Sequence, residues 1–222
     1  TVRGAISEAG VEPAKVVGIG VDATASTPLP VDAQGQALAL TDAFKEDPDA
    51  MAWLWKDHSS LAEANEITAK AAALRPEYLA KCGGTYSSEW YWSKILHCAR
   101  VAPKVFAAAN DWIELPDWIP FVLTGQLKRC LCAAGHKGLY CPDWGGYADA
   151  DFLAAVDPCL VRIREGLPDQ AYHIGHATGG LNAEWANKLG LPEGIPVAMG
   201  IIDAHAGAVG SGIQPVSYTH LR

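Results

Sequence analysis

The segment from residue 194 to residue 210 limits the possible folds more than any other part of the chain. It begins as an apolar run, residues 194–202, which is typical of a strand buried on both faces. Asp203 and a series of small residues follow. Open α/β sheets bind ligands at the carboxyl ends of their strands, and small side chains leave room for one. Asp203 is therefore either a general base or the N-cap of the next segment, and this pattern alone favours neither role.

Composition and charge indicate a globular chain. Its 222 residues suffice for one large domain or two small ones, and with 50% hydrophobic and 19% charged residues it has enough apolar material for a core. The formal net charge of -8 argues against nucleic acid or an anionic membrane surface as the main partner. No apolar run approaches the roughly 18 residues that indicate a membrane span.

The six cysteines do not indicate a disulfide framework or a metal site. The chain is long for a disulfide-stapled domain, so we expect free thiols in a reducing cytoplasm. A structural zinc site usually contains two closely spaced cysteine pairs, whereas only Cys130 and Cys132 form such a pair here. We therefore predict no metal ligands.

Alternating strand and helix patterns predict an α/β fold. Apolar runs bounded by turn residues predict strands at residues 15–22, 28–31, 36–40 and 130–140, with the second and third forming a hairpin. Capping residues, prolines and glycines predict helices at residues 59–73, 87–98, 111–124, 149–156 and 182–189. Small residues, 23–27, follow the first predicted strand and suit either a ligand-binding wall or a plain turn.

Three features combine residue types that can bind a sugar. Residues 52–58 contain two tryptophans, a lysine, an aspartate and a histidine. Tryptophan faces stack on sugar C–H groups, and the polar side chains can form hydrogen bonds with hydroxyls. Packing of the tryptophans in the core is nevertheless the simpler interpretation. Lys137 lies among small and apolar residues, so it needs either a polar partner or a path to the surface. Glu89 in a first helical turn suits the helix dipole, but it could also face a ligand.

Motifs distributed along the chain resemble those of the FGGY carbohydrate kinases. Residues 194–210, with Asp203, and residues 117–125 carry the general resemblance. Four further segments narrow it to the ribulokinase group of that family: Val21–Pro28, Leu54–His58, Tyr86–Trp90 and Ala134–Lys137. Together the resemblance covers residues 16–213, and the motifs are specific as a set.

The resemblance implies an α/β domain of the ribonuclease-H-like, actin-like ATPase superfamily, incomplete at both ends. It implies an enzyme that transfers the γ-phosphoryl group of ATP to the terminal hydroxyl of L-ribulose, with D-ribulose as a second candidate, to give ribulose 5-phosphate in L-arabinose catabolism. By the same resemblance Asp203 is the catalytic base, and Ala25, Trp55, Lys137 and Asp203 line the ketose site. ATP and Mg²⁺ are the implied cofactors, and a cytoplasmic homodimer is the implied state of the whole protein.

The sequence departs from the family pattern at both ends. The phosphate loop expected before Thr1 and the ATP-binding domain expected after Gly212 are not in the sequence. We therefore expect residues 1–213 to be a partial N-terminal domain with the sugar side of the cleft and the base, no cofactor-binding residues, and no activity alone. Residues 214–222 do not continue the preceding pattern and are interpreted as a non-native tail.

Three alternatives remain open from the sequence. The first is another FGGY sugar kinase acting on xylulose or ribitol. The second is a non-catalytic sugar-binding fragment, which keeps Trp55 and Lys137 but gives Asp203 no chemical role. The third is a metal hydrolase using Asp203, His205 and His136, although the sequence offers no convincing third ligand.

Overall fold

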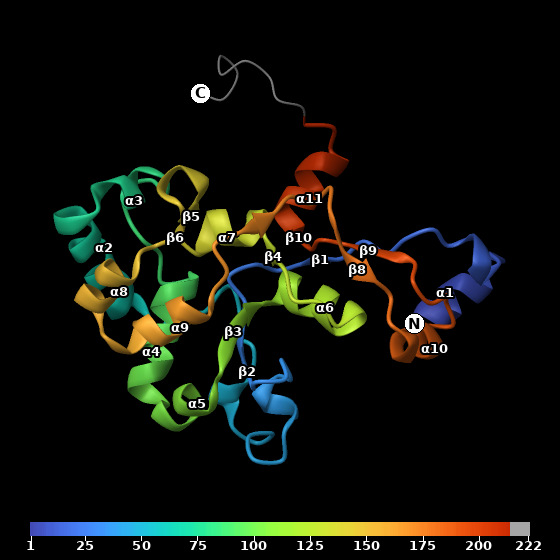
Figure 1. Cartoon of the computed structure of the whole chain (residues 1–222), viewed down its shortest axis with the longest axis horizontal. Coiled ribbons are helices and arrows are strands. Elements are labelled where there is room, and N and C mark those ends of the chain that lie inside the picture. The colour runs from blue at the N-terminus through green and yellow to red at the C-terminus, as the bar shows by residue number, and fades with distance from the viewer. Residues whose placement is uncertain (214–222) are drawn as a thin grey trace.

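The computed structural model describes residues 1–213, and the predicted tail at residues 214–222 lies outside them. Helices and short strands alternate along the chain, so the predicted α/β class is confirmed (Figure 1). The α-helices are α1 (Val2–Glu8), α2 (Leu61–Leu74), α3 (Pro76–Ala80), α4 (Tyr91–Val101), α5 (Pro103–Ala108), α6 (Leu115–Thr124), α7 (Leu131–Lys137), α8 (Ala150–Val156), α9 (Cys159–Gly166), α10 (Ala183–Leu189) and α11 (Asp203–Gly210). The strands are β1 (Asp22–Ala23), β2 (Pro28–Val31), β3 (Asp111–Glu114), β4 (Arg129–Cys130), β5 (Tyr140–Cys141), β6 (Gly146–Tyr147), β7 (Ala171–Tyr172), β8 (Ala177–Gly180), β9 (Pro196–Ala198) and β10 (Ile201–Ile202).

The pairing of β1 with β10 joins an early segment of the chain to a late one. The two strands are parallel, with Asp22 opposite Ile201 and Ala23 opposite Ile202. Because their carboxyl ends therefore meet at one edge, residues 24–27 and Asp203 leave the sheet from the same place. Strands β2 and β3 pair in antiparallel fashion, β4 pairs with β7 in parallel, and β8 pairs with β9 in antiparallel fashion.

A helical body carries the main core. Helix α2 buries Ala64, Ile67 and Ala71, whose three- and four-residue spacing forms one apolar face. This face packs in the same core cluster as Trp92 and Ile95 of α4. Figure 1 shows α2, α4, α8 and α9 gathered in this body on one side of the strands. No helix in the described part of the chain is long and apolar enough to cross a bilayer.

A smaller lobe contains α1, α10, β8 and β9 and projects from the opposite side (Figure 1). Its own core cluster includes Leu181, Ala186 and Val197. At Gly200, between β9 and β10, a Cβ atom would lie 1.8 Å from the Pro116 carbonyl oxygen of α6. Only glycine therefore allows the chain to pass this close to α6 on its way to the sheet edge.

Helices were predicted more accurately than strands. Helix α2 lies where it was expected. The side chain of Asp149 caps α8 by accepting a hydrogen bond from the Phe152 amide, and the side chain of Asn182 caps α10 by accepting one from the Trp185 amide. Helix α4 begins at Tyr91 rather than at residue 87, and residues 111–114 of the predicted helix 111–124 form β3 instead.

Three of the strand predictions were wrong in extent. Residues 13–15 form a 3-10 helix, and only Ile19 and then β1 pair within the predicted strand 15–22. The expected hairpin reduces to a single bridge between Val31 and Ala37, because β2 pairs with β3 and residues 38–40 form a 3-10 helix.

The predicted strand at residues 130–140 is mostly helix α7. The Sγ atom of Cys130 accepts a hydrogen bond from the Ala133 amide, which caps the helix, and Gly138 follows its last residue. The small residues Ala133 and Ala134 are buried on the packed side. Local capping therefore outweighed the apolar run from which a strand was predicted.

Candidate active site

A cavity of about 280 Å³ lies at the edge where β1 and β10 end. All four residues predicted to line a ketose site, Ala25, Trp55, Lys137 and Asp203, line this cavity. The remaining lining residues are Thr24, Ser26, Glu89, His136, Ile202, Ala204 and His205. Segments far apart in the sequence thus present a carboxylate, an ammonium group and an aromatic face to one space.

A larger hollow of about 530 Å³ contains none of these four residues. Its walls include Trp53, Lys56 and His97. We favour the smaller cavity as the active site, because it lies at the carboxyl ends of parallel strands and collects charged side chains from several segments.

Asp203 is the first residue of α11 and is exposed. Its Oδ1 atom accepts a hydrogen bond from the Ala204 amide at 2.7 Å. The N-cap position itself belongs to Ile202, so the alternative prediction that Asp203 is the N-cap was wrong by one residue. Within residues 1–213 the carboxylate forms no ion pair, which leaves an oxygen available to a ligand.

Lys137 is the last residue of α7, where the helix dipole favours a cation. Its Nζ atom lies 5.4 Å from the centroid of the Trp90 ring. Burial lowers the pKa of Lys137, while the nearby carboxylates of Glu89 and Glu114 act in the opposite direction. This ammonium group makes no ion pair in the described part of the chain, so it is free to bond oxygen atoms of a ligand.

The two tryptophans of residues 52–58 have different roles. Trp53 is buried, and its Nε1 donates to the Asp49 carbonyl oxygen at 2.9 Å. Trp55 is 49% exposed and forms part of the cavity wall. The core interpretation was therefore correct for Trp53 only.

Lys94 was missed by the sequence analysis. It is fully buried on the apolar face of α4, and burial lowers its pKa to about 8. Its Nζ donates to the carbonyl oxygens of Ser26, of Leu54 at 2.6 Å and of Trp53 at 3.3 Å. Lys94 therefore ties the segment that carries Trp55 to the segment that carries Ala25. A lysine between apolar helix positions was the available signal.

Glu114 at the end of β3 supports the same wall. Its Oε2 accepts from the Thr27 amide at 2.9 Å, while Oε1 is buried without a hydrogen-bond partner among residues 1–213. Burial raises the pKa of Glu114 to about 7. Ser26, between these supports, has a φ of 59°, the left-handed conformation that non-glycine residues rarely adopt. The backbone at residues 24–27 is thus held in an unusual shape by buried charges behind it.

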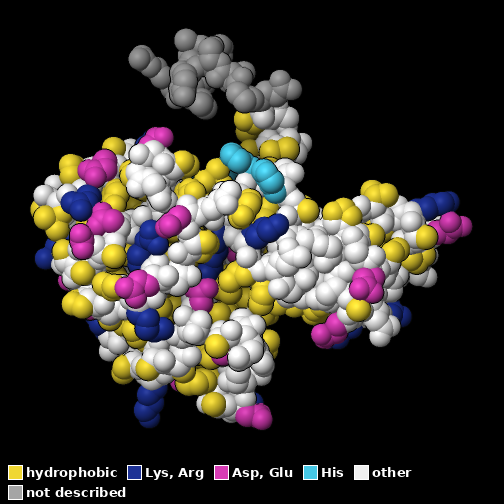
Figure 2. Space-filling view, viewed as in Figure 1, with side chains coloured by type: hydrophobic (Ala, Val, Ile, Leu, Met, Phe, Trp, Pro, Cys, Tyr) yellow, Lys and Arg dark blue, Asp and Glu magenta, His cyan; other side chains and the backbone are white. Residues whose placement is uncertain are grey.

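Histidines border the other side of the cavity. The ring centroids of His136 and His205 lie 5.6 Å apart, and burial together with the Lys137 and His205 charges lowers the pKa of His136 to about 4. Figure 2 shows histidine side chains gathered beside α11. Among residues 1–213, no group of three or more His, Cys, Asp or Glu side chains is arranged to hold a metal ion. Asp203, His205 and His136, the residues of the metal-hydrolase alternative, line the same cavity, but among the described residues they do not form such a group.

A sequence profile for the N-terminal domain of the FGGY family of carbohydrate kinases matches residues 1–210. The chain belongs to this family. It is 45% identical over 203 residues to a ribulokinase from Vibrio parahaemolyticus, covering 89% of this chain and 36% of that protein. It is 36% identical over 214 residues to a ribulokinase from Bacillus licheniformis, covering 96% of this chain and 39% of that protein. The FGGY chain thus spans little more than a third of the length of these relatives.

Solved structures support the same fold. A xylulose kinase from Rhodospirillum rubrum aligns with a TM-score of 0.70 at 21% identity, over 96% of this FGGY chain and 40% of that chain. A ligand-bound xylulose kinase from Lactobacillus acidophilus aligns with a TM-score of 0.70 at 16% identity, over 95% and 39% of the respective chains. At these identities the likeness concerns the fold alone, which is that of the actin-like sugar kinases expected from the sequence.

Proposed function

We propose that this chain is the sugar-binding part of a kinase that phosphorylates L-ribulose to ribulose 5-phosphate at the expense of ATP. The observation that supports the proposal most directly is that Ala25, Trp55, Lys137 and Asp203, from four separate segments, line one cavity. The identity to curated ribulokinases over most of the chain supports the choice of ketose. L-arabinose catabolism and a cytoplasmic setting are the expected context.

Each of these side chains has a role that suits phosphoryl transfer. Trp55 offers a flat wall to the C–H face of the sugar, and Lys137 donates hydrogen bonds to its oxygens. The terminal hydroxyl oxygen attacks the γ-phosphorus of ATP, the bond from phosphorus to the β–γ bridging oxygen breaks, and Asp203 accepts the hydroxyl proton. Positioning and proton acceptance are thus the contributions assigned to this chain.

The proposal places most contacts with the nucleotide and the metal ion outside residues 1–213. Since the chain spans 36 to 39% of the length of the relatives compared, we propose that most ATP contacts come from sequence beyond residues 1–213. Mg²⁺ would neutralise phosphate charge in such a reaction, and the proposal assigns it, like the nucleotide, mainly to sequence beyond residues 1–213. ATP turnover by the 222-residue chain alone would contradict this division.

The test is ATP-dependent phosphorylation by the complete protein that contains this chain, with product analysis. The substrate panel contains L-ribulose, D-ribulose, xylulose and ribitol. We expect the highest kcat/KM with L-ribulose. A clear preference for xylulose or ribitol would support the assignment as a kinase but contradict L-ribulose as its substrate. No transfer to any member of the panel would overturn the proposed function.

A further inference from the structure

We propose that Glu89 is a substrate-contacting residue that selects among ketose epimers by accepting a hydrogen bond from one sugar hydroxyl. This inference rests on the proposed function and deepens it, since it concerns the same cavity. Glu89 lines that cavity with Trp55, Lys137 and Asp203. Glu89 belongs to the motif segment Tyr86–Trp90, to which no role was assigned from the sequence, and helix capping does not account for its place, because the helix that follows, α4, begins at Tyr91 with Trp90 as its N-cap.

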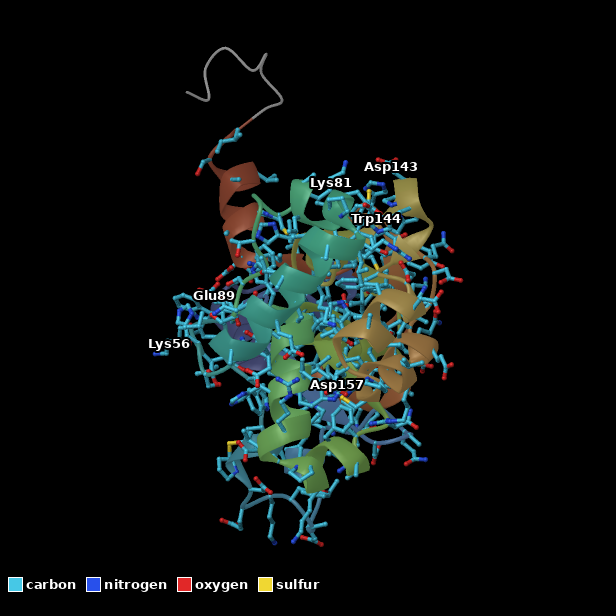
Figure 3. All side chains as sticks on the ribbon, turned by 90° about the vertical axis from the view of Figure 1, so that its left-hand side faces the viewer. Lys56, Lys81, Glu89, Asp143, Trp144 and Asp157 are labelled. Atoms are coloured by element: carbon cyan, nitrogen blue, oxygen red, sulfur yellow. The ribbon has the colours of Figure 1, made fainter. Side chains whose placement is uncertain are left out.

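His58, which does not line the cavity, contacts the carboxylate of Glu89. The Nε2 atom of His58 lies 3.5 Å from Oε1 of Glu89, and the Nδ1 atom of His58 is 2.9 Å from the Ser88 hydroxyl. His58 belongs to the segment that carries Trp55, so one contact links the aromatic wall to the carboxylate. Figure 3 shows Glu89 on the side of the molecule that also carries Lys56 of this segment.

The carboxylate has hydrogen-bonding capacity that the described residues do not use. Within residues 1–213 it accepts no hydrogen bond of ordinary length, and its side chain is only 29% exposed. A half-buried carboxylate with unfilled acceptor positions is suited to a ligand that donates hydrogen bonds.

Glu89 also complements Lys137 across the cavity. Both side chains line the same cavity, and the Glu89 charge raises the pKa of Lys137 against the effect of burial. They are nevertheless too far apart for an ion pair, since none forms between them in the described part of the chain. A polyhydroxylated ligand fits between such a pair, because it can accept from the ammonium group and donate to the carboxylate at the same time.

The test compares Glu89→Gln with wild type in the complete protein. Steady-state kinetics are measured with L-ribulose, L-xylulose and D-xylulose, of which the last two each invert one hydroxyl of L-ribulose. Since a hydrogen bond to a charged group is lost, we expect KM for L-ribulose to rise about 10- to 100-fold. We expect kcat to change by less than about threefold. The preference for L-ribulose over at least one epimer should fall about tenfold.

Two controls separate a contact role from a structural one. Glu46→Gln removes an exposed carboxylate outside the cavity and should change neither KM nor the epimer preference. His58→Gln weakens the support of Glu89 and should raise KM less than Glu89→Gln. A thermal melt of each variant checks that it is folded.

The outcomes distinguish this inference from the proposed function. Unchanged KM and epimer preference in a folded Glu89→Gln variant would overturn the inference and leave the kinase proposal standing. Calorimetric titration with L-ribulose covers the opposite case. Wild-type protein that binds the ketose without phosphorylating it would overturn the kinase proposal, and the ratio of Kd values for wild type and Glu89→Gln would still decide the role of Glu89.

Discussion

At the scale of single residues, the cavity depends on charged groups that are buried behind it. Glu114 accepts a hydrogen bond from the Thr27 amide, yet its other carboxylate oxygen has no partner in the described part of the chain, and burial raises its pKa to about 7. Burial therefore destabilises the charged carboxylate by more than the Thr27 hydrogen bond and the nearby lysine charges stabilise it. The folded state favours the neutral form of this side chain.

The raised pKa of Glu114 predicts that ionisation of this side chain lowers the stability of the folded protein. The folded pKa lies above the unfolded value of 4.5, so the folded protein binds more protons and the free energy of unfolding falls as pH rises from about 4.5 to about 7. Glu114→Gln stays neutral, and we expect it to be about 3 kcal/mol more stable than wild type at pH 8 and nearly equal at pH 4.5. Urea unfolding at both pH values measures the difference. A variant that loses stability relative to wild type as pH rises would contradict the argument.

At the scale of elements, Lys94 connects α4 to two loops of the active site. Lys94→Met keeps similar bulk but leaves the carbonyl oxygens of Ser26, Trp53 and Leu54 without their donor. We expect the free energy of unfolding to fall by about 1–3 kcal/mol and KM for the ketose to rise, because Trp55 loses its support. Denaturant unfolding and kinetics of Lys70→Met, an exposed site on α2, provide the comparison. Unchanged KM would show that the Trp55 wall does not need this support.

Gly200 lies where the chain between β9 and β10 passes close to α6. A Cβ atom there meets backbone at 1.8 Å, so Gly200→Ala must displace α6 or β10. We expect a loss of at least about 2 kcal/mol in the free energy of unfolding. Gly4→Ala in α1, where a Cβ meets none of the described residues within 4 Å, should instead be neutral or slightly stabilising. Equal effects of the two substitutions would show that the close approach carries no constraint.

At the scale of the whole molecule, local patterns predicted elements and the motif resemblance predicted the site. Capping residues located α8 and α10, since those signals act over a few residues. Helix α2 also lies where it was predicted, although Ser60 at its N-cap forms no side-chain capping hydrogen bond. Strand pairing depends on distant partners, and the pairing of β1 with β10 joins residues that no local pattern relates. For Trp55 and Lys137, the residue pattern alone favoured core or surface roles, and only the resemblance indicated a ligand site. Lys94 and Glu114 were missed because their partners are backbone atoms far away in the sequence.

The most direct test of the central proposal separates chemistry from binding at Asp203. In the complete protein, kcat for L-ribulose phosphorylation and the Kd of L-ribulose are measured for wild type and Asp203→Asn, with the exposed Asp42→Asn as control. Loss of a general base predicts that kcat falls about 100- to 10,000-fold, while Kd changes by less than about threefold because Trp55 and Lys137 still hold the ketose. A variant with wild-type kcat, or with its whole defect in Kd, would contradict the assignment of Asp203 as the base.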